Sequence, residues 1–195
     1  MKNTLVATII IALLTALNVA CSEGQPWVGV SAATNAGSRI ERGKYLVTVV
    51  GCGDCHTPMK MGPTGPEPDL AKLLSGHPEQ VGPLPAAKPQ GPWLWAGAAT
   101  NTAFAGPWGV SYAANLTPDQ NTGLGVWTSE MFVKAIRTGR HMSASREILP
   151  PMPWPAFRNA TDEDLLSIYA YLRSLKPITN HVPDAQPPAT VAGTN

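Results

Sequence analysis

Cys52 and Cys55 stand three positions apart in the sequence, and His56 follows the second cysteine directly. On a helix, residues three apart are separated by about 300° of rotation and about 4.5 Å of rise, so both sulfur atoms face one side. The imidazole that follows can reach a metal held on that side. Three kinds of chemistry use such a motif: covalent haem attachment, a thiol–disulfide redox pair and a zinc site.

The haem interpretation uses all three side chains of the motif. Cys52 and Cys55 can form thioethers with the two vinyl groups of a single haem, while His56 ligates the iron. A thiol–disulfide pair would need a βαβ pattern, which the chain does not show, and would leave the histidine unused. A zinc site would need a second ligand pair, whereas His77 and His141 are isolated. We therefore expect one covalently bound haem c in the chain.

The first 20 residues have the pattern of an export signal. Lys2 gives a short positive start, and residues 5–17 are almost unbroken apolar sequence. This run is at the upper length for a signal core and slightly short for a membrane span, so an uncleaved anchor helix is the alternative. Covalent haem attachment also belongs outside the cytoplasm in bacteria. We expect residues 1–20 to be a signal peptide and the remainder to lie in the periplasm.

Cys21 is the odd cysteine once the other two are assigned to one site. Its position after small residues resembles the cleavage site of bacterial lipoproteins, where the cysteine carries lipid. This resemblance implies a membrane anchor at Cys21. The residues that follow it are small and polar, so we expect residues 21–37 to form a tether. Asn18 stands where those sites favour leucine, so ordinary cleavage nearby is the alternative.

The first helix is expected over residues 38–51. Ser38 and Glu41 form a capping box at its start. Gly43 lies in the middle of this helix, where a glycine costs about 1 kcal/mol relative to alanine. We therefore expect another backbone to cross closely at Gly43.

Two further helices are predicted from their capping residues. One opens at Thr128 and ends at Gly139, which suits the left-handed conformation common after a helix. The other opens at Thr161, is followed by acidic residues in its first turn, and is stopped by Pro177.

The segment between the motif and Thr128 has little periodicity and a proline or glycine every few positions. The whole chain contains 20 Pro and 18 Gly. A structureless stretch of this length is uncommon in a compact domain, so something other than side-chain packing should organise it. A haem would do so. The end of the chain, residues 184–195, is expected to be a flexible tail.

Several stretches together resemble the class I c-type cytochromes, in particular bacterial single-haem proteins and the cytochrome subunits that accompany periplasmic dehydrogenases. They are RGKYLVTVVGCGDCHTP, LSGHPE, NLTPD, TGLGVW, ILPPMPW and DEDLLSIYAYLRSLKP. The resemblance covers residues 38–183. It implies an all-α cytochrome c fold, with three main helices around one covalent haem and a long Pro/Gly-rich loop segment. It also implies a helix crossing at Gly43, opposite Tyr171 and Leu172.

A second axial ligand decides the chemistry of the haem. The candidates are Met59, Met61, His77, Met131, His141, Met142 and Met152. Met152 stands among prolines that build a stiff loop, and the resembled family places its axial methionine in such a loop. We expect His56 and Met152 as the iron ligands, with Met142 or His141 as alternatives. We expect the carbonyl of Pro63 or Pro66 to accept a hydrogen bond from His56 Nδ1.

The resemblance implies one-electron transfer rather than catalysis. The partners would be redox proteins: a dehydrogenase, a respiratory complex or an oxidase. An open-site haem protein, acting as a peroxidase or binding a small ligand, is the alternative, although His141 beside Arg140 is its only candidate acid–base pair. The net charge is +1 without a long basic run, so nucleic acid is not an expected partner. Trp93, Trp95 and Trp108 could wall the haem or form a docking patch.

Overall fold

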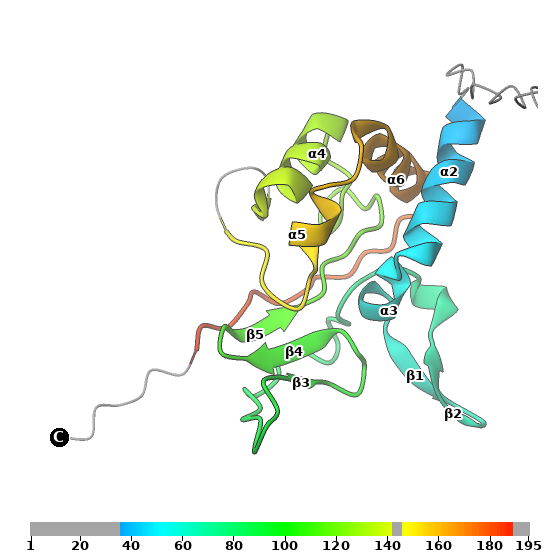
Figure 1. Ribbon diagram of the computed structural model, residues 1–195. Coiled ribbons are helices and arrows are strands. Elements are labelled where there is room, and N and C mark those ends of the chain that lie inside the picture. The colour runs from blue at the N-terminus through cyan, green and yellow to red at the C-terminus, as the bar shows by residue number, and fades with distance from the viewer. Residues whose placement is uncertain (1–35, 142–145, 189–195) are drawn as a thin grey trace, which may run out of the picture. The chain divides into compact units, whose positions relative to one another are not determined.

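The computed structural model describes residues 36–141 and 146–188 (Figure 1). The predicted signal peptide, Cys21 and nearly all of the predicted tether lie outside these ranges, as does Met142. The elements in chain order are α2 (Ala36–Val49), α3 (Cys52–His56), β1 (Met59–Gly62), β2 (Gly65–Pro68), the 3₁₀ helix η2 (Leu70–Lys72), β3 (Ala96–Gly97), β4 (Ala103–Gly106), β5 (Gly109–Tyr112), α4 (Ser129–Thr138), α5 (Trp154–Phe157) and α6 (Asp162–Ser174).

The predicted all-α fold class is wrong, because the described residues contain two antiparallel sheets beside five α-helices. Strands β1 and β2 form a hairpin, and strands β3, β4 and β5 form a sheet in that order. In both the β1–β2 hairpin and the β4–β5 hairpin, the turn consists of two residues that stand between two glycines. Gly65 and Gly109 begin the returning strands with φ of 131° and 94°, values that other residues adopt only with strain. The Pro/Gly-rich segment is therefore partly sheet.

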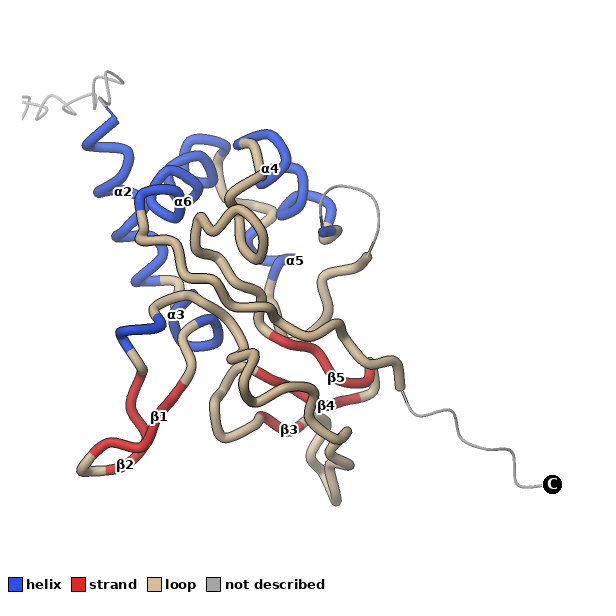
Figure 2. The backbone as a smooth tube through the Cα atoms, turned by 180° about the vertical axis from the view of Figure 1, so that it is seen from behind, coloured by secondary structure: helices blue, strands red, loops and turns tan. Residues whose placement is uncertain are grey.

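Helix α2 crosses helix α6 at Gly43, which confirms the close backbone approach predicted from this glycine. A methyl group at this position would overlap the carbonyl oxygen of Ser167 and would lie 2.8 Å from Cβ of Tyr171. The two helices lie side by side in both views of the backbone (Figures 1 and 2). Leu172, one position further along α6, is buried in the core with 2% of its surface exposed.

The caps of the two later helices are confirmed. Thr128 Oγ1 accepts a hydrogen bond from Met131 N ahead of α4, and Gly139 follows this helix with φ 69°. Thr161 Oγ1 accepts from Asp164 N ahead of α6. The predicted start of the first helix is wrong, because α2 already includes Ala36 and Ser38 is therefore inside it.

The main core lies between the helices and the loops that pack on them. Its members are Val47, Leu74, Leu124, Trp127, Phe132, Ala135, Ile136, Leu165 and Leu172. Cys52 and Met152 are partly buried and pack against this same cluster. A smaller buried group comes from the sheet and includes Phe104 and Val110.

The segment after α6 returns across the molecule toward β5 (Figure 2). Asn180 Nδ2 donates to the carbonyl oxygens of Ser75 and His77, at 2.7 and 2.9 Å. Gln186 exchanges two backbone hydrogen bonds of 2.9 Å with Val110. Gln186 belongs to the segment predicted to be a flexible tail, but these two hydrogen bonds hold it against the sheet. No helix within residues 36–141 and 146–188 is long and apolar enough to cross a membrane.

Candidate functional site

Helix α3 presents the three residues of the motif. It follows Gly51, whose φ of 72° lets the chain leave α2 and begin a new short helix at once. Cys52, Cys55 and His56 are all partly buried, and neither thiol is in a disulfide bond. The structure therefore places the three predicted haem-binding side chains on a single helical turn.

The surroundings of the two thiols do not suit a redox disulfide. Burial raises the pKa of Cys52 to about 11, and burial together with the charge of Asp54 raises the pKa of Cys55. Thiol–disulfide enzymes lower the pKa of their attacking cysteine, since the thiolate is the reactive form. The environment of α3 instead raises the pKa of both thiols.

His56 is held through one ring nitrogen. Its Nδ1 lies 2.8 Å from the carbonyl oxygen of Ala114. A carbonyl can only accept, so Nδ1 carries the proton and Nε2 keeps its lone pair. Burial lowers the pKa of His56, which favours this neutral form. Neutral imidazole whose other nitrogen donates to a carbonyl is the usual form of a metal-ligating histidine.

The predicted acceptor for His56 is wrong. Pro66 pairs with Met61 in the β1–β2 hairpin, and Pro63 stands in its turn. This hairpin projects from the end of α3 (Figure 1). The acceptor, Ala114 O, belongs instead to the segment that follows β5.

The backbone behind His56 is fixed by the segment that contains Gly76. Gly76 N donates to His56 O at 2.8 Å, and Leu74 N donates to Thr57 Oγ1 at 3.0 Å. Gly76 has φ 80°, and a side chain there would overlap the carbonyl oxygen of Ala113. Close approach of these two backbones therefore requires a glycine at this position.

A loop between β3 and β4 also contacts α3 and the strand β1 that follows it. Asn101 Nδ2 donates to Asp54 O at 2.7 Å, and Met59 N donates to Thr100 O at 2.9 Å. The motif is thus held by two segments that lie at a distance from it in the sequence.

Met152 lies in a loop anchored to the sheet. Ser111 Oγ on β5 donates to Pro150 O at 2.5 Å, and Met152 packs against the cluster that Cys52 also contacts. Because proline restricts the backbone on both sides of Met152, this hydrogen bond also restrains the backbone that carries the thioether.

The two histidine candidates for the second axial position have different surroundings. Both ring nitrogens of His77 have partners, with Nδ1 at 2.9 Å from Thr102 Oγ1 and Nε2 at 3.0 Å from Gly82 O. His141 packs edge-on against Trp127, with ring centroids 5.0 Å apart.

The other methionine candidates lie in three different surroundings. Met61 on β1 is 77% exposed, and Met59 on the same strand pairs with Pro68. Met131 on α4 packs against the main core from outside, as a core methionine does.

No sequence pattern marks Ser111 or Ala114 as a residue of the site. Ala114 is 58 positions from His56, and Ser111 is 39 positions from Pro150, so no local pattern connects them. Asn115 directly follows this segment, and its amide donates to Ile178 O at 2.8 Å.

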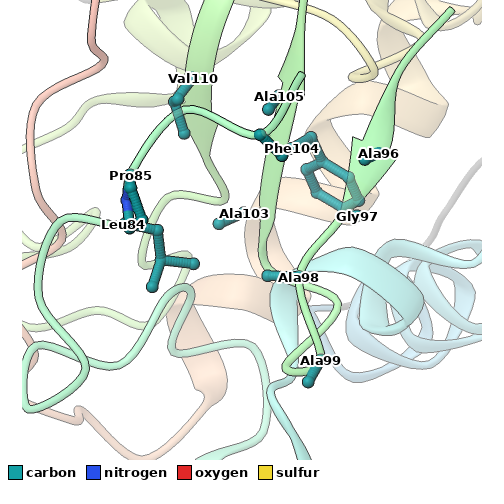
Figure 3. Close-up of a pocket in the computed structure, with 11 residues that line it drawn as sticks. Leu84, Pro85, Ala96, Gly97, Ala98, Ala99, Ala103, Phe104, Ala105 and Val110 are labelled. Carbon is teal, nitrogen blue, oxygen red and sulfur yellow. The ribbon is translucent and has the colours of Figure 1, made fainter. Parts of the chain in front are cut away.

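A separate apolar hollow of about 290 Å³ lies on the β3–β4–β5 sheet (Figure 3). Leu84 and Pro85 line one side of it, and residues 96–99 and 103–105 line the other. No residue of α3 lines this hollow, so it is distinct from the candidate site.

No family model matches the chain. It is similar to the fructose dehydrogenase cytochrome subunit of Gluconobacter japonicus, with 30% identity over 150 residues. It is also similar to the gluconate 2-dehydrogenase cytochrome c subunit of Pantoea cypripedii, with 27% identity over 150 residues. The chain is homologous to dehydrogenase cytochrome subunits. One of the subunits of the nicotinate dehydrogenase of Pseudomonas putida is a further relative, 30% identical over 147 residues.

These alignments cover 75–76% of this chain but only a small part of each relative. The aligned part is 24% of the fructose dehydrogenase protein, 26% of the gluconate dehydrogenase protein and 9% of the nicotinate dehydrogenase protein. The donor set on α3 fits the haem c of a cytochrome, because two free thiols and a neutral imidazole occupy one turn.

Proposed function

We propose that the chain is a one-electron carrier that binds one haem c through Cys52 and Cys55, with His56 and Met152 as the axial ligands. The hydrogen bond from His56 Nδ1 to Ala114 O carries this proposal. It leaves Nε2 as the nitrogen available to iron and orients the ring from behind. The homology to cytochrome subunits supports the same assignment.

Each proposed ligand has a defined task. A bound haem supplies an Fe(III)/Fe(II) couple, and histidine–methionine ligation gives it a higher potential than two histidines would. Ala114 orients His56 through the Nδ1 bond. The proline-rich loop, anchored at Ser111, holds Met152 in one place. A ligand loop that does not move between the two oxidation states favours rapid electron exchange.

The homology also suggests the partners. We propose that a dehydrogenase reduces this cytochrome and that a respiratory complex or an oxidase accepts its electron. We further propose that the protein is exported to the periplasm and attached to the membrane by lipid at Cys21. Release of the protein from the membrane fraction by Cys21→Ser tests the anchor; retention of the variant there would contradict it.

We propose that docking depends on apolar contact more than on charge. The net charge is only +1, and Val49 and Val50, just before the motif, are 57% and 41% exposed. Trp93 is 74% exposed and so does not wall a buried group. An electron-transfer rate that falls steeply with ionic strength would contradict this mode of docking.

The open-site alternative has less support. Arg140 forms an ion pair with Glu147 at 3.0 Å, and His141 packs on Trp127. Neither contact places Arg140 and His141 as an acid–base pair at α3.

The ferric spectrum of the haem-loaded protein tests the proposal. A methionine–iron bond gives a weak red charge-transfer band, which we expect in the wild type. Met152→Ala should abolish this band, and Met61→Ala, which changes an exposed methionine, should preserve it. A high-spin wild-type spectrum without the band would overturn the proposed ligation and favour the open-site function.

A further inference from the structure

Ser111 has a buried hydroxyl that donates a hydrogen bond to the loop containing Met152. Only 7% of the residue is exposed. Its Oγ donates to Pro150 O at 2.5 Å and accepts from Trp108 Nε1 at 3.2 Å. A hydroxyl has one proton to donate, and the short contact assigns that proton to Pro150.

The same stretch of chain holds His56 three residues later, where Ala114 O accepts from Nδ1. Between the two contacts, the backbone is bonded on both sides. Ala113 N donates to Thr102 O at 2.8 Å, and Ala113 O accepts from His77 N at 2.9 Å. Segment 111–114 therefore has little freedom to shift.

Strand β5 is also held along both of its edges. It pairs with β4 through the register Ala103↔Tyr112 to Gly106↔Gly109. On its other edge, Val110 exchanges hydrogen bonds with Gln186. Strand β5 therefore lies between β4 and the C-terminal segment (Figure 2). A strand paired on both sides is a firmer support than a loop.

We infer that Ser111 is a positioning residue for Met152, and that segment 111–114 supports both axial ligands of the proposed haem. This inference rests on the proposed function. The Ser111 hydroxyl restrains Pro150, and the proline-rich backbone passes that restraint to the thioether two residues further on. Loss of the hydroxyl makes the thioether easier to displace without removing it. A neutral hydrogen bond of this kind changes such an equilibrium by about two- to tenfold.

The test is an imidazole titration of the ferric, haem-loaded protein, because imidazole reaches the iron only after the thioether leaves. We expect Ser111→Ala to keep the red band and to bind imidazole about two- to tenfold more tightly. Ser111→Thr retains the hydroxyl and should restore the wild-type affinity. Ser174→Ala is the matched control, because its hydroxyl donates only within α6, to Tyr171 O.

Trp108→Phe gives a second test that leaves Ser111 in place. It removes the indole N–H that donates to Ser111 Oγ, and a hydroxyl that no longer accepts this bond is a weaker donor to Pro150 O. Imidazole affinity should again increase. Unchanged affinity in both Ser111→Ala and Trp108→Phe would overturn the inference, as would a Ser111→Thr variant that behaves like the alanine variant. A red band that survives Met152→Ala is a separate result, because it would refute the proposed ligand itself.

Discussion

Gly43 of α2 lies so close to Ser167 of α6 that the two helix backbones meet without a side chain between them. Helix α2 leads directly to the motif, so the angle at which it crosses α6 also sets where α3 begins. The crossing therefore affects the candidate site as well as the stability of the fold.

We predict that Gly43→Ala destabilises the protein although alanine is the better helix former. The added methyl group overlaps the Ser167 carbonyl, and overpacking of this kind typically costs about 1–3 kcal/mol. Denaturant unfolding of the haem-loaded protein measures the loss. Gly37→Ala, at an exposed position of the same helix, is the control and should be neutral or slightly stabilising. Equal effects of the two substitutions would refute the close crossing.

We predict that Gly76→Ala weakens the support of His56. Its φ of 80° and the adjacent Ala113 backbone leave no room for a methyl group, so the variant must displace the segment that carries the Ala114 carbonyl. A weaker bond to Nδ1 makes the imidazole a poorer donor to iron, and the reduction potential should rise. Potentiometry measures this shift.

Gly91→Ala is the control for this prediction. Gly91 also has positive φ, 63°, but nothing lies within 4 Å of an added methyl group. Both variants should lose about 1–2 kcal/mol from the left-handed conformation, whereas only Gly76→Ala should change the potential. A potential shift of the same size in both would argue against the role of the Ala114 carbonyl.

We predict an acid-dependent contribution from Asp119. Hydrogen bonds from Thr122 and Thr179 lower the pKa of this carboxyl from 3.8 to about 2. A lowered pKa means that the stabilisation is fully present above the unfolded value and is lost as the pH falls from about 4 toward 2. The free energy of unfolding, measured across this range, should depend less on pH in Asp119→Asn.

Thr179→Val provides a second measurement on the same carboxyl. It removes the hydroxyl that donates to Asp119 Oδ2 at 2.8 Å and leaves the carboxylate in place. We expect a pH dependence between those of the wild type and Asp119→Asn. Three identical curves between pH 4 and 2 would show that Asp119 contributes nothing to acid stability.

We predict that covalent haem retention requires the thiols of α3. After denaturing electrophoresis, haem staining should remain with the wild-type chain and disappear in the Cys52→Ser/Cys55→Ser double variant. Cys21→Ser should retain the stain, because it leaves the α3 thiols intact. Covalent haem in the double variant would contradict the assignment of these residues.

Local signals in the sequence predicted several features correctly. Thr128 and Thr161 cap the helices α4 and α6, and Gly43 marks a close crossing. These features depend on contacts with a few neighbouring residues or on the absence of a side chain. Such requirements can be read from a single residue and its neighbours.

The sheets were missed although part of their signal was visible. GPTG and GPWG each place two residues between glycines, as tight hairpin turns require. The strands beside them have only four residues each, too few for an alternating pattern to be clear. The tertiary contacts of β5 with β4 and Gln186 supply the stabilisation that such short strands lack by themselves.

The sequence alone determined the chemistry that α3 can present, because two thiols and an imidazole at this spacing face one side of any helix. Only the tertiary structure decided what supports them. The acceptor for His56 is the backbone carbonyl of Ala114, and the anchor of the Met152 loop is Ser111. Every residue has a backbone carbonyl, so the sequence cannot mark which one becomes the acceptor. That choice follows from tertiary contacts: His77 N donates to Ala113 O and Gly76 N donates to His56 O, which brings the segment after β5 beside α3.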